Sequence, residues 1–175
     1  MFLVNKTITS LENLFNGCKS LIEFNDTFIP PNGVSSYLNT FKNCTSLKKL
    51  NDNFKISEYT TIVENLFYNC INLEELPSGF TLSETTTSLS GICFDCRNLK
   101  TISETFWPVD GFKEESAINI ESAFYNCEKM SGTVPQYKLW KDNITWISNE
   151  TNKPLTFKNC RSLNNYIFIP TNWRW

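Results

Sequence analysis

Cysteine is the residue type in this 175-residue chain that points most directly to chemistry, with seven copies. A thiol becomes a nucleophile or a metal ligand where a base or a positive neighbour lowers its pKa. The chain contains no His, so the usual base partner and the commonest metal ligand are both missing. Cys93 and Cys96 have the C-x-x-C spacing of a redox pair or of half a zinc site. Zinc needs four ligands, and the others would have to come from distant parts of the sequence.

Six of the seven cysteines are one position of a repeat. The stretch FYNCINLEEL, which ends at Leu76, recurs as FNGCKSLIEF, FKNCTSLKKL and CFDCRNLKTI, and in looser form as FYNCEKMSGT and FKNCRSLNNY. The repeated cysteines, the first four spaced by 26 residues, are Cys18, Cys44, Cys70, Cys96, Cys127 and Cys160. Cys93 fills a slot that the other units give to Phe. We therefore predict packing roles, with Cys18 to Cys127 of this series buried, reduced and unreactive.

The repeat must fold into elements that stack, because each unit can bury its apolar side only against its neighbours. A period of roughly 20 to 50 residues is typical of a solenoid. In F-x-x-C the spacing of three predicts one or two helical turns on the convex side. The L-x-x-L pattern after the cysteine predicts the strand of the concave side.

The motif F-x-x-C-x-x-L is matched by FNGCKSL, FKNCTSL, FYNCINL and FKNCRSL. It resembles the BspA-like branch of the leucine-rich-repeat proteins, which occurs in bacterial and protozoan surface proteins and in bacteriophage tail or fibre proteins. The resemblance implies an α/β solenoid with short concave parallel strands and short helical or irregular convex segments. We expect a single array of about six units over residues 1–175. We also expect insertions at about 107–113 and 137–154 and an aromatic C-terminal cap at about 166–175.

Charge and hydropathy exclude two classes of partner. Sixteen Lys and Arg stand against eighteen Asp and Glu, for a net charge of -2, without a block of like charges. We therefore expect no binding to nucleic acid or to anionic lipid. No apolar run approaches the roughly 20 residues that cross a bilayer, and Met1 to Lys6 do not resemble a secretion signal. Neither membrane insertion nor a cofactor is expected.

Charged residues of alternating sign form predicted ladders on the concave strands. If the rungs stack in register, the ladder residues are Lys48, Lys49, Glu74, Glu75 and Lys100. One interpretation makes them the concave ligand surface that many solenoids use. The other makes them cross-strand ion pairs, each contributing roughly 0.2 to 1 kcal/mol to stacking. The alternation of sign favours the ion pairs.

Aromatic residues gather in the last third of the chain, where the repeat lengthens. The candidate partner-binding residues are Trp107, Tyr137, Trp140 and Trp146, all in the insertions. Aromatic side chains dominate interface hot spots. An open solenoid end also needs a cover, and we expect Trp173 and Trp175 to supply it. The two roles can coexist in the insertions.

Together these features predict a non-catalytic recognition or structural module that binds a protein or a surface glycan, including other virion or surface proteins. The resemblance implies that it belongs to a bacteriophage virion or to a bacterial cell surface. The alternative is a carboxylate-based hydrolase such as a glycosidase, with Glu74–Glu75 or Glu114–Glu115 as its acids. Adjacent residues on a strand point to opposite faces, so neither pair converges on one bond. We therefore predict no catalytic, cofactor-binding or metal-binding residue.

Overall fold

A computed structural model describes residues 8–24, 28–113, 117–134, 145–147 and 154–175. Regular elements are short: the 3-10 helices η1 (Glu104–Phe106) and η2 (Tyr166–Phe168), the strands β1 (Ala117–Asn119) and β2 (Thr145–Ile147), and the helix α2 (Thr171–Arg174). β1 and β2 pair in parallel, with Ala117 opposite Thr145. Turns and extended segments form the rest of the described chain.

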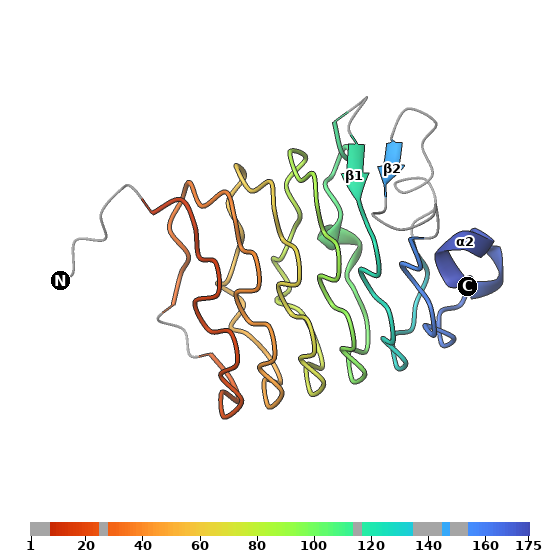
Figure 1. Cartoon of the computed structure of the whole chain (residues 1–175), viewed down its shortest axis with the longest axis horizontal. Coiled ribbons are helices and arrows are strands. Elements are labelled where there is room, and N and C mark those ends of the chain that lie inside the picture. Colours follow the sequence, from red (N-terminus) through yellow and green to blue (C-terminus); the bar gives the residue numbers. More distant parts are fainter. Residues whose placement is uncertain (1–7, 25–27, 114–116, 135–144, 148–153) are drawn as a thin grey trace.

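Successive repeats lie side by side as rungs along the long axis of the molecule (Figure 1). Single-residue parallel bridges connect them, in the order Ser10, Ser36, Ile62, Ser88 and Asn119. Beyond each bridge, alternate N–H groups donate to the next rung. Phe15 donates to the carbonyl of Thr40 at 2.8 Å, and Phe41 donates to that of Leu66 at 2.9 Å. The sequence period is therefore also the period of the backbone hydrogen bonds.

The F-x-x-C motif forms the second of two consecutive turns. The first turn closes from Leu14 N–H to the Leu11 carbonyl at 3.2 Å, and the second closes from Cys18 N–H to the Phe15 carbonyl at 3.1 Å. In both turns the third residue has positive φ, 58° at Asn13 and 77° at Gly17. The spacing of three that predicted helical turns belongs to these turns instead.

Positive φ recurs in every unit at the same two positions, five residues and one residue before the cysteine. The first position is held by Asn13, Asn39, Asn65, Gly91, Ser122 and Leu155, and the second by Gly17, Asn43, Asn69, Asp95, Asn126 and Asn159. Gly, Asn and Asp reach this left-handed region at least cost. The two turns require positive φ at these positions, which explains why Gly, Asn and Asp recur there in the sequence.

The L-x-x-L pattern predicted a strand after the cysteine, but the extended backbone lies mainly before the motif. After the cysteine the bonds between rungs are fewer, such as Glu74 N–H to the Lys48 carbonyl at 2.9 Å, and one isolated parallel bridge joins Glu23 to Lys49. The bridge column lies eight residues before the cysteine, beside Ser and Thr residues. Their hydroxyls add bonds between rungs, such as Thr87 Oγ1 to the Thr61 carbonyl at 3.3 Å. Extended structure thus forms where side chains reinforce the backbone ladder.

Two columns of phenylalanine fill the core. In the first, three residues before the cysteine, the rings of Phe15 and Phe41 stack at 5.2 Å, with an interplanar angle of 11°. In the second, Phe54 and Phe80 stack at 6.3 Å, with an angle of 3°. Rungs in register place like rings face to face, so the columns bury aromatic surface along the molecule, and only Cys93 interrupts the first column.

The C-terminal segment closes one end of the stack. Leu155 and Phe157 donate their N–H groups to the carbonyls of Asn172 and Trp173, at 3.2 and 2.8 Å. The Trp173 ring stacks on Phe157 at 6.2 Å and is buried. Trp175 is 52% exposed, with the Arg161 guanidinium 5.8 Å from its ring centre. Trp173 is therefore the covering residue at this end.

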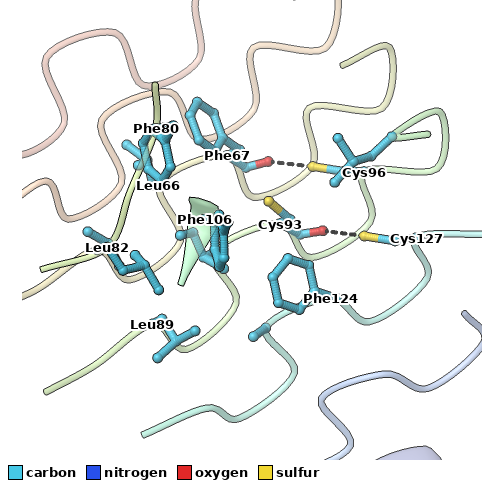
Figure 2. Packing of buried hydrophobic residues seen from close by; sticks show 14 of the residues in the cluster. Leu66, Phe67, Phe80, Leu82, Leu89, Cys93, Cys96, Phe106, Phe124 and Cys127 are labelled. Atoms are coloured by element: carbon cyan, nitrogen blue, oxygen red, sulfur yellow. Dashed lines mark hydrogen bonds between the residues drawn. The ribbon is translucent and has the colours of Figure 1, made fainter. Parts of the chain in front are cut away.

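Each buried repeat cysteine donates its thiol hydrogen to the preceding rung (Figure 2). The bonds run from Cys96 Sγ to the Phe67 carbonyl and from Cys127 Sγ to the Cys93 carbonyl, both at 3.1 Å. Cys70 Sγ makes the same bond to Phe41. Sulfur is a weak donor, but the bond satisfies the thiol inside the core.

Cys18 departs from the prediction that the repeat cysteines are buried. Its side chain is exposed, whereas Cys44, Cys70, Cys96, Cys127 and Cys160 are buried. The reason is its place in the first described rung, because no other described rung covers the outer side. Cys93 is buried in the slot of the phenylalanine column, so it keeps the packing role predicted for it.

The buried thiols make stability sensitive to alkaline pH. Burial raises the pKa of Cys44 to about 11 and the pKa values of Cys70, Cys93 and Cys127 well above the ordinary thiol value. The unfolded chain releases these protons above about pH 8.5, while the folded chain keeps them. We expect the free energy of unfolding to fall as pH rises toward about 10, with a slope that approaches about 1.4 kcal/mol per pH unit for each thiol.

Urea unfolding at several pH values under reducing conditions measures this slope. Cys70→Ala removes one such thiol, so its slope should be shallower by about 1.4 kcal/mol per pH unit. Cys18→Ala removes an exposed thiol and serves as the matched control. Equal slopes for Cys70→Ala and the unaltered chain would contradict the burial of Cys70.

Candidate functional site

The predicted charge ladder brings its residues to one face but forms a single close ion pair. Lys100 Nζ lies 2.5 Å from Glu74 Oε2, and both side chains are exposed. The hydrogen bond and charge of Lys100 lower the pKa of Glu74. Within the described ranges, Lys48, Lys49 and Glu75 make no comparable contact. The ion-pair interpretation therefore applies to one pair.

Lys49 and Glu75 instead border a shallow hollow of about 300 Å³, which also includes Asp52. Ser78 donates to Asp52 from its N–H and its hydroxyl, both at 3.1 Å. Both bonds reach Oδ1, and they lower the pKa of Asp52. The carboxylates of Glu23, Asp52 and Glu75 line the hollow against the single ammonium of Lys49, so its net charge does not favour an anionic ligand.

Trp107 does not belong to an exposed recognition surface, so this prediction is wrong. Its side chain is only 2% exposed and lies edge-on to Phe106 at 4.8 Å and to Phe124 at 6.2 Å. At this level Cys93 takes the place of a phenylalanine in the first column. The indole therefore adds bulk to the core beside a rung that has lost a ring.

The other predicted aromatic residues fall in or beside the second insertion. Tyr137 and Trp140 lie outside the described residues. Trp146 lies in β2, opposite Ile118 of β1, and its side chain is likewise outside the described part. Their proposed role in partner binding therefore stays a prediction.

The first insertion shapes a groove of about 610 Å³ against two rungs. Its walls are residues 108–111 and 113 of the insertion and residues 56–59 and 81–85 of the rungs. A turn closed by Gly111 N–H and the Pro108 carbonyl, at 3.0 Å, gives the insertion its shape. Lys113 N–H donates to the Glu84 carbonyl at 3.2 Å and fixes the insertion to the rung.

The groove combines exposed apolar groups with carboxylates. Tyr59 is 62% exposed and Val109 is 84% exposed. Glu58, Glu84 and Asp110 supply three acidic groups, against the single ammonium of Lys113. The hydroxyl of Ser83 donates to the Glu58 carbonyl at 2.5 Å, so it is engaged in a bond between two rungs. Lys113 Nζ lies 3.9 Å from Glu84 Oε1, so the one ammonium of the groove is paired with one of its carboxylates. Exposed apolar groups beside an excess of carboxylates suit an uncharged or cationic ligand.

Sequence reasoning missed Tyr59 and Val109 because neither residue belongs to a repeated column of the motif. Val109 lies within the predicted insertion, between Pro108 and Asp110. Its place among turn-forming residues was the signal that this apolar side chain is exposed. Tyr59 lies between two motifs, in a stretch that the alignment of the repeats on cysteine does not compare. The groove exists only where the two stretches meet in space.

A second missed feature is a half-buried aromatic stack two residues before the cysteines. Tyr68 and Phe94 stack at 4.6 Å, and Phe94 and Tyr125 stack at 4.9 Å. Lys42 and Lys158 place their ammonium groups 4.8 and 5.3 Å from the two outer rings. Neighbours cover the ring faces, and sugar stacking needs a free face. The stack therefore contributes to stability between rungs.

Glu74 does not suit the general-acid role of the hydrolase alternative. A glycosidase needs a general acid whose pKa is raised, whereas Lys100 lowers the pKa of Glu74. The second pair, Glu114–Glu115, lies outside the described residues. In the described ranges no three His, Cys, Asp or Glu side chains converge as a metal site requires.

Comparison with family models, curated proteins and solved structures finds no match for this chain. The helices in the described part of the chain are too short or too polar to cross a membrane.

The Glu74–Lys100 pair predicts a small stability effect that depends on salt and pH. Because the folded state lowers the pKa of Glu74, its stabilisation is present above the ordinary carboxylate pKa of about 4.3 and is lost as pH falls through the lowered value. We expect Lys100→Glu to lower the melting temperature slightly at neutral pH, and less at high salt. The double exchange Glu74→Lys with Lys100→Glu should restore most of the loss. A double exchange no more stable than Lys100→Glu alone would show that the pair contributes nothing.

Proposed function

We propose that this protein is a non-catalytic recognition module, a BspA-like leucine-rich-repeat solenoid that binds a protein or surface glycan in the groove beside residues 108–113. The observation that carries the proposal is the groove itself, which exposes Tyr59 and Val109 on an otherwise regular stack of rungs. Exposed apolar side chains beside polar groups are typical of binding sites.

The family assignment is supported by the period of 26 residues, by the F-x-x-C-x-x-L motif and by the parallel bonds that join successive units. Members of that family work through surfaces, on bacterial cells or on bacteriophage tails and fibres. We place this protein in one of these two settings. Immunogold labelling of purified virions and of intact bacteria distinguishes them.

Recognition is favoured over catalysis by the way the rungs use their polar groups. Thiols donate to carbonyls of the preceding rung, and threonine hydroxyls such as that of Thr60 do the same, in this case to Val34 at 2.9 Å. A nucleophile needs an activating base, and a thiol whose pKa burial has raised lacks one.

Two substitutions in the groove test the proposal. Tyr59→Ala removes the exposed ring, and Val109→Asp adds a charge to the apolar wall. We expect each to weaken binding at least tenfold, about 1.4 kcal/mol. The melting temperature should hold, because both side chains are exposed. Glycan arrays and immobilised bacterial surface extracts provide the ligands for the unaltered chain.

Phe168→Ala is the matched control, because Phe168 is equally apolar and exposed but lies outside the groove. It should leave binding unchanged. If Phe168→Ala weakened binding as much as the groove substitutions, or if the groove substitutions had no effect on a ligand that the unaltered chain binds, the groove would not be the site.

A further inference from the structure

Each wall of the groove places a carboxylate directly beside an exposed apolar side chain. On the rung side Glu58 precedes Tyr59, and on the insertion side Asp110 follows Val109. All four residues are exposed. Two stretches that lie far apart in the sequence therefore present the same combination of apolar surface and negative charge to one ligand.

Three uncharged hydroxyls of the groove are already engaged within the stack. Ser57 is buried, and its Oγ accepts two backbone N–H groups, at 3.2 and 3.1 Å. The hydroxyls of Ser83 and Thr85 share a hydrogen bond at 2.8 Å, and each also donates to the Glu58 carbonyl. A neutral sugar needs polar groups that are free to bond its hydroxyls, so these side chains favour it poorly. The carboxylates are the groups that discriminate between ligands, because they repel an acidic sugar and attract a cation.

The chain itself places one cation against these carboxylates. Lys113 Nζ lies 3.9 Å from Glu84 Oε1, and both side chains are exposed. This distance is too long for a strong hydrogen bond, so charge alone holds the pair, and only weakly. The backbone of Lys113 is fixed separately, because its N–H donates to the Glu84 carbonyl at 3.2 Å. The ammonium can therefore give way to another cation while the insertion keeps its place.

Negative charge remains in excess after the Glu84–Lys113 pair is counted. The Glu58 carboxylate forms no ion pair among the described residues. Asp110 adds a further carboxylate on the opposite wall. Opposite charges that meet across an interface favour the correct partner and speed its approach. The groove is therefore complementary to a ligand that carries positive charge next to apolar surface.

Given the groove as the binding site of the proposed function, we propose that its ligand is a cationic segment of a partner polypeptide. An arginine or lysine side chain of the segment lies against Tyr59 and Val109 and directs its charged end to Glu58. Both side chains have long aliphatic stems that pack on apolar surface while the charged end reaches a polar group. A cation over the exposed ring of Tyr59 adds a cation–π contact. A second cation of the segment replaces Lys113 beside Glu84.

An array of random synthetic peptides, probed with the labelled full chain, tests which side chains the groove prefers. We expect arginine and lysine to be enriched about threefold or more among the bound peptides, because charge complementarity selects them. Fluorescence anisotropy then gives the affinity of the strongest peptide. Its binding should weaken at least fivefold between about 0.05 and about 0.5 M salt, because salt screens exposed charges.

Two substitutions with opposite expected effects locate the cation. Glu58→Gln removes a carboxylate of the groove and should weaken binding of the selected peptide at least fivefold. Lys113→Met removes the internal competitor and should strengthen binding at least twofold. Glu104→Gln is the matched control, because Glu104 is an exposed acid outside the groove, and it should change affinity less than twofold. Circular dichroism checks that all three variants are folded.

Some outcomes would overturn this proposal and leave the groove as the binding site. One is a selected ligand that loses affinity with Tyr59→Ala but not with Glu58→Gln. Another is a set of bound peptides no richer in arginine and lysine than the array. A third is saturable binding of a chitosan oligosaccharide when no peptide binds up to about 1 mM, which would assign the cation to an amino sugar. Peptides whose affinity neither Tyr59→Ala nor Glu58→Gln lowers would instead contradict the groove itself, and with it the proposed function.

Discussion

The alternate N–H groups that each rung donates to the next are the interaction on which the structure depends. They require a backbone that turns twice within eight residues and still directs every second N–H along the stack. Positive φ at two positions of each unit permits this path, and Asn or Gly holds most of those positions. Once the ladder is fixed, equivalent side chains of successive units lie one above another. The phenylalanine columns and the thiol bonds follow from that register.

The repeated cysteine fits this ladder for a specific reason. The carbonyl at the Phe41 position accepts the N–H of Cys44, within its own turn, and the thiol of Cys70, from the next rung. A side chain at this point must be small and apolar and must also carry a donor. Cysteine meets all three conditions, because it packs as a small hydrophobe with a weak S–H donor. The abundance of free thiols is therefore a packing solution and does not indicate thiol chemistry.

The period was readable from the sequence, but the local conformation was not. A spacing of three is common to helical turns and to the hydrogen bond of a β-turn, so F-x-x-C could not separate them. The better signal was the Asn, Gly or Asp before each repeat cysteine, which favours positive φ over a continuing helix. Trp107 was misassigned because an insertion can fold inward as well as outward. The replacement of a Phe by Cys93 in the same unit was the sign that the core needed another ring.

Regular surfaces of this molecule leave few polar groups free for a partner. Asn69 Nδ2 donates to Asn43 Oδ1 at 3.0 Å, and Asn159 Nδ2 donates to Asn126 Oδ1 at 2.7 Å, so these amides bond along the stack. At Asp95 the side chain has no donor, and it accepts from Asn126 at 3.0 Å. Side chains that bond to the neighbouring rung in this way stabilise the stack, but the same atoms are not available to bind a ligand. Exposed apolar side chains beside a hollow are found where the repeat is broken, at the insertion that forms the groove. In a stack of this kind, irregularities of the repeat are therefore the places at which to look for binding.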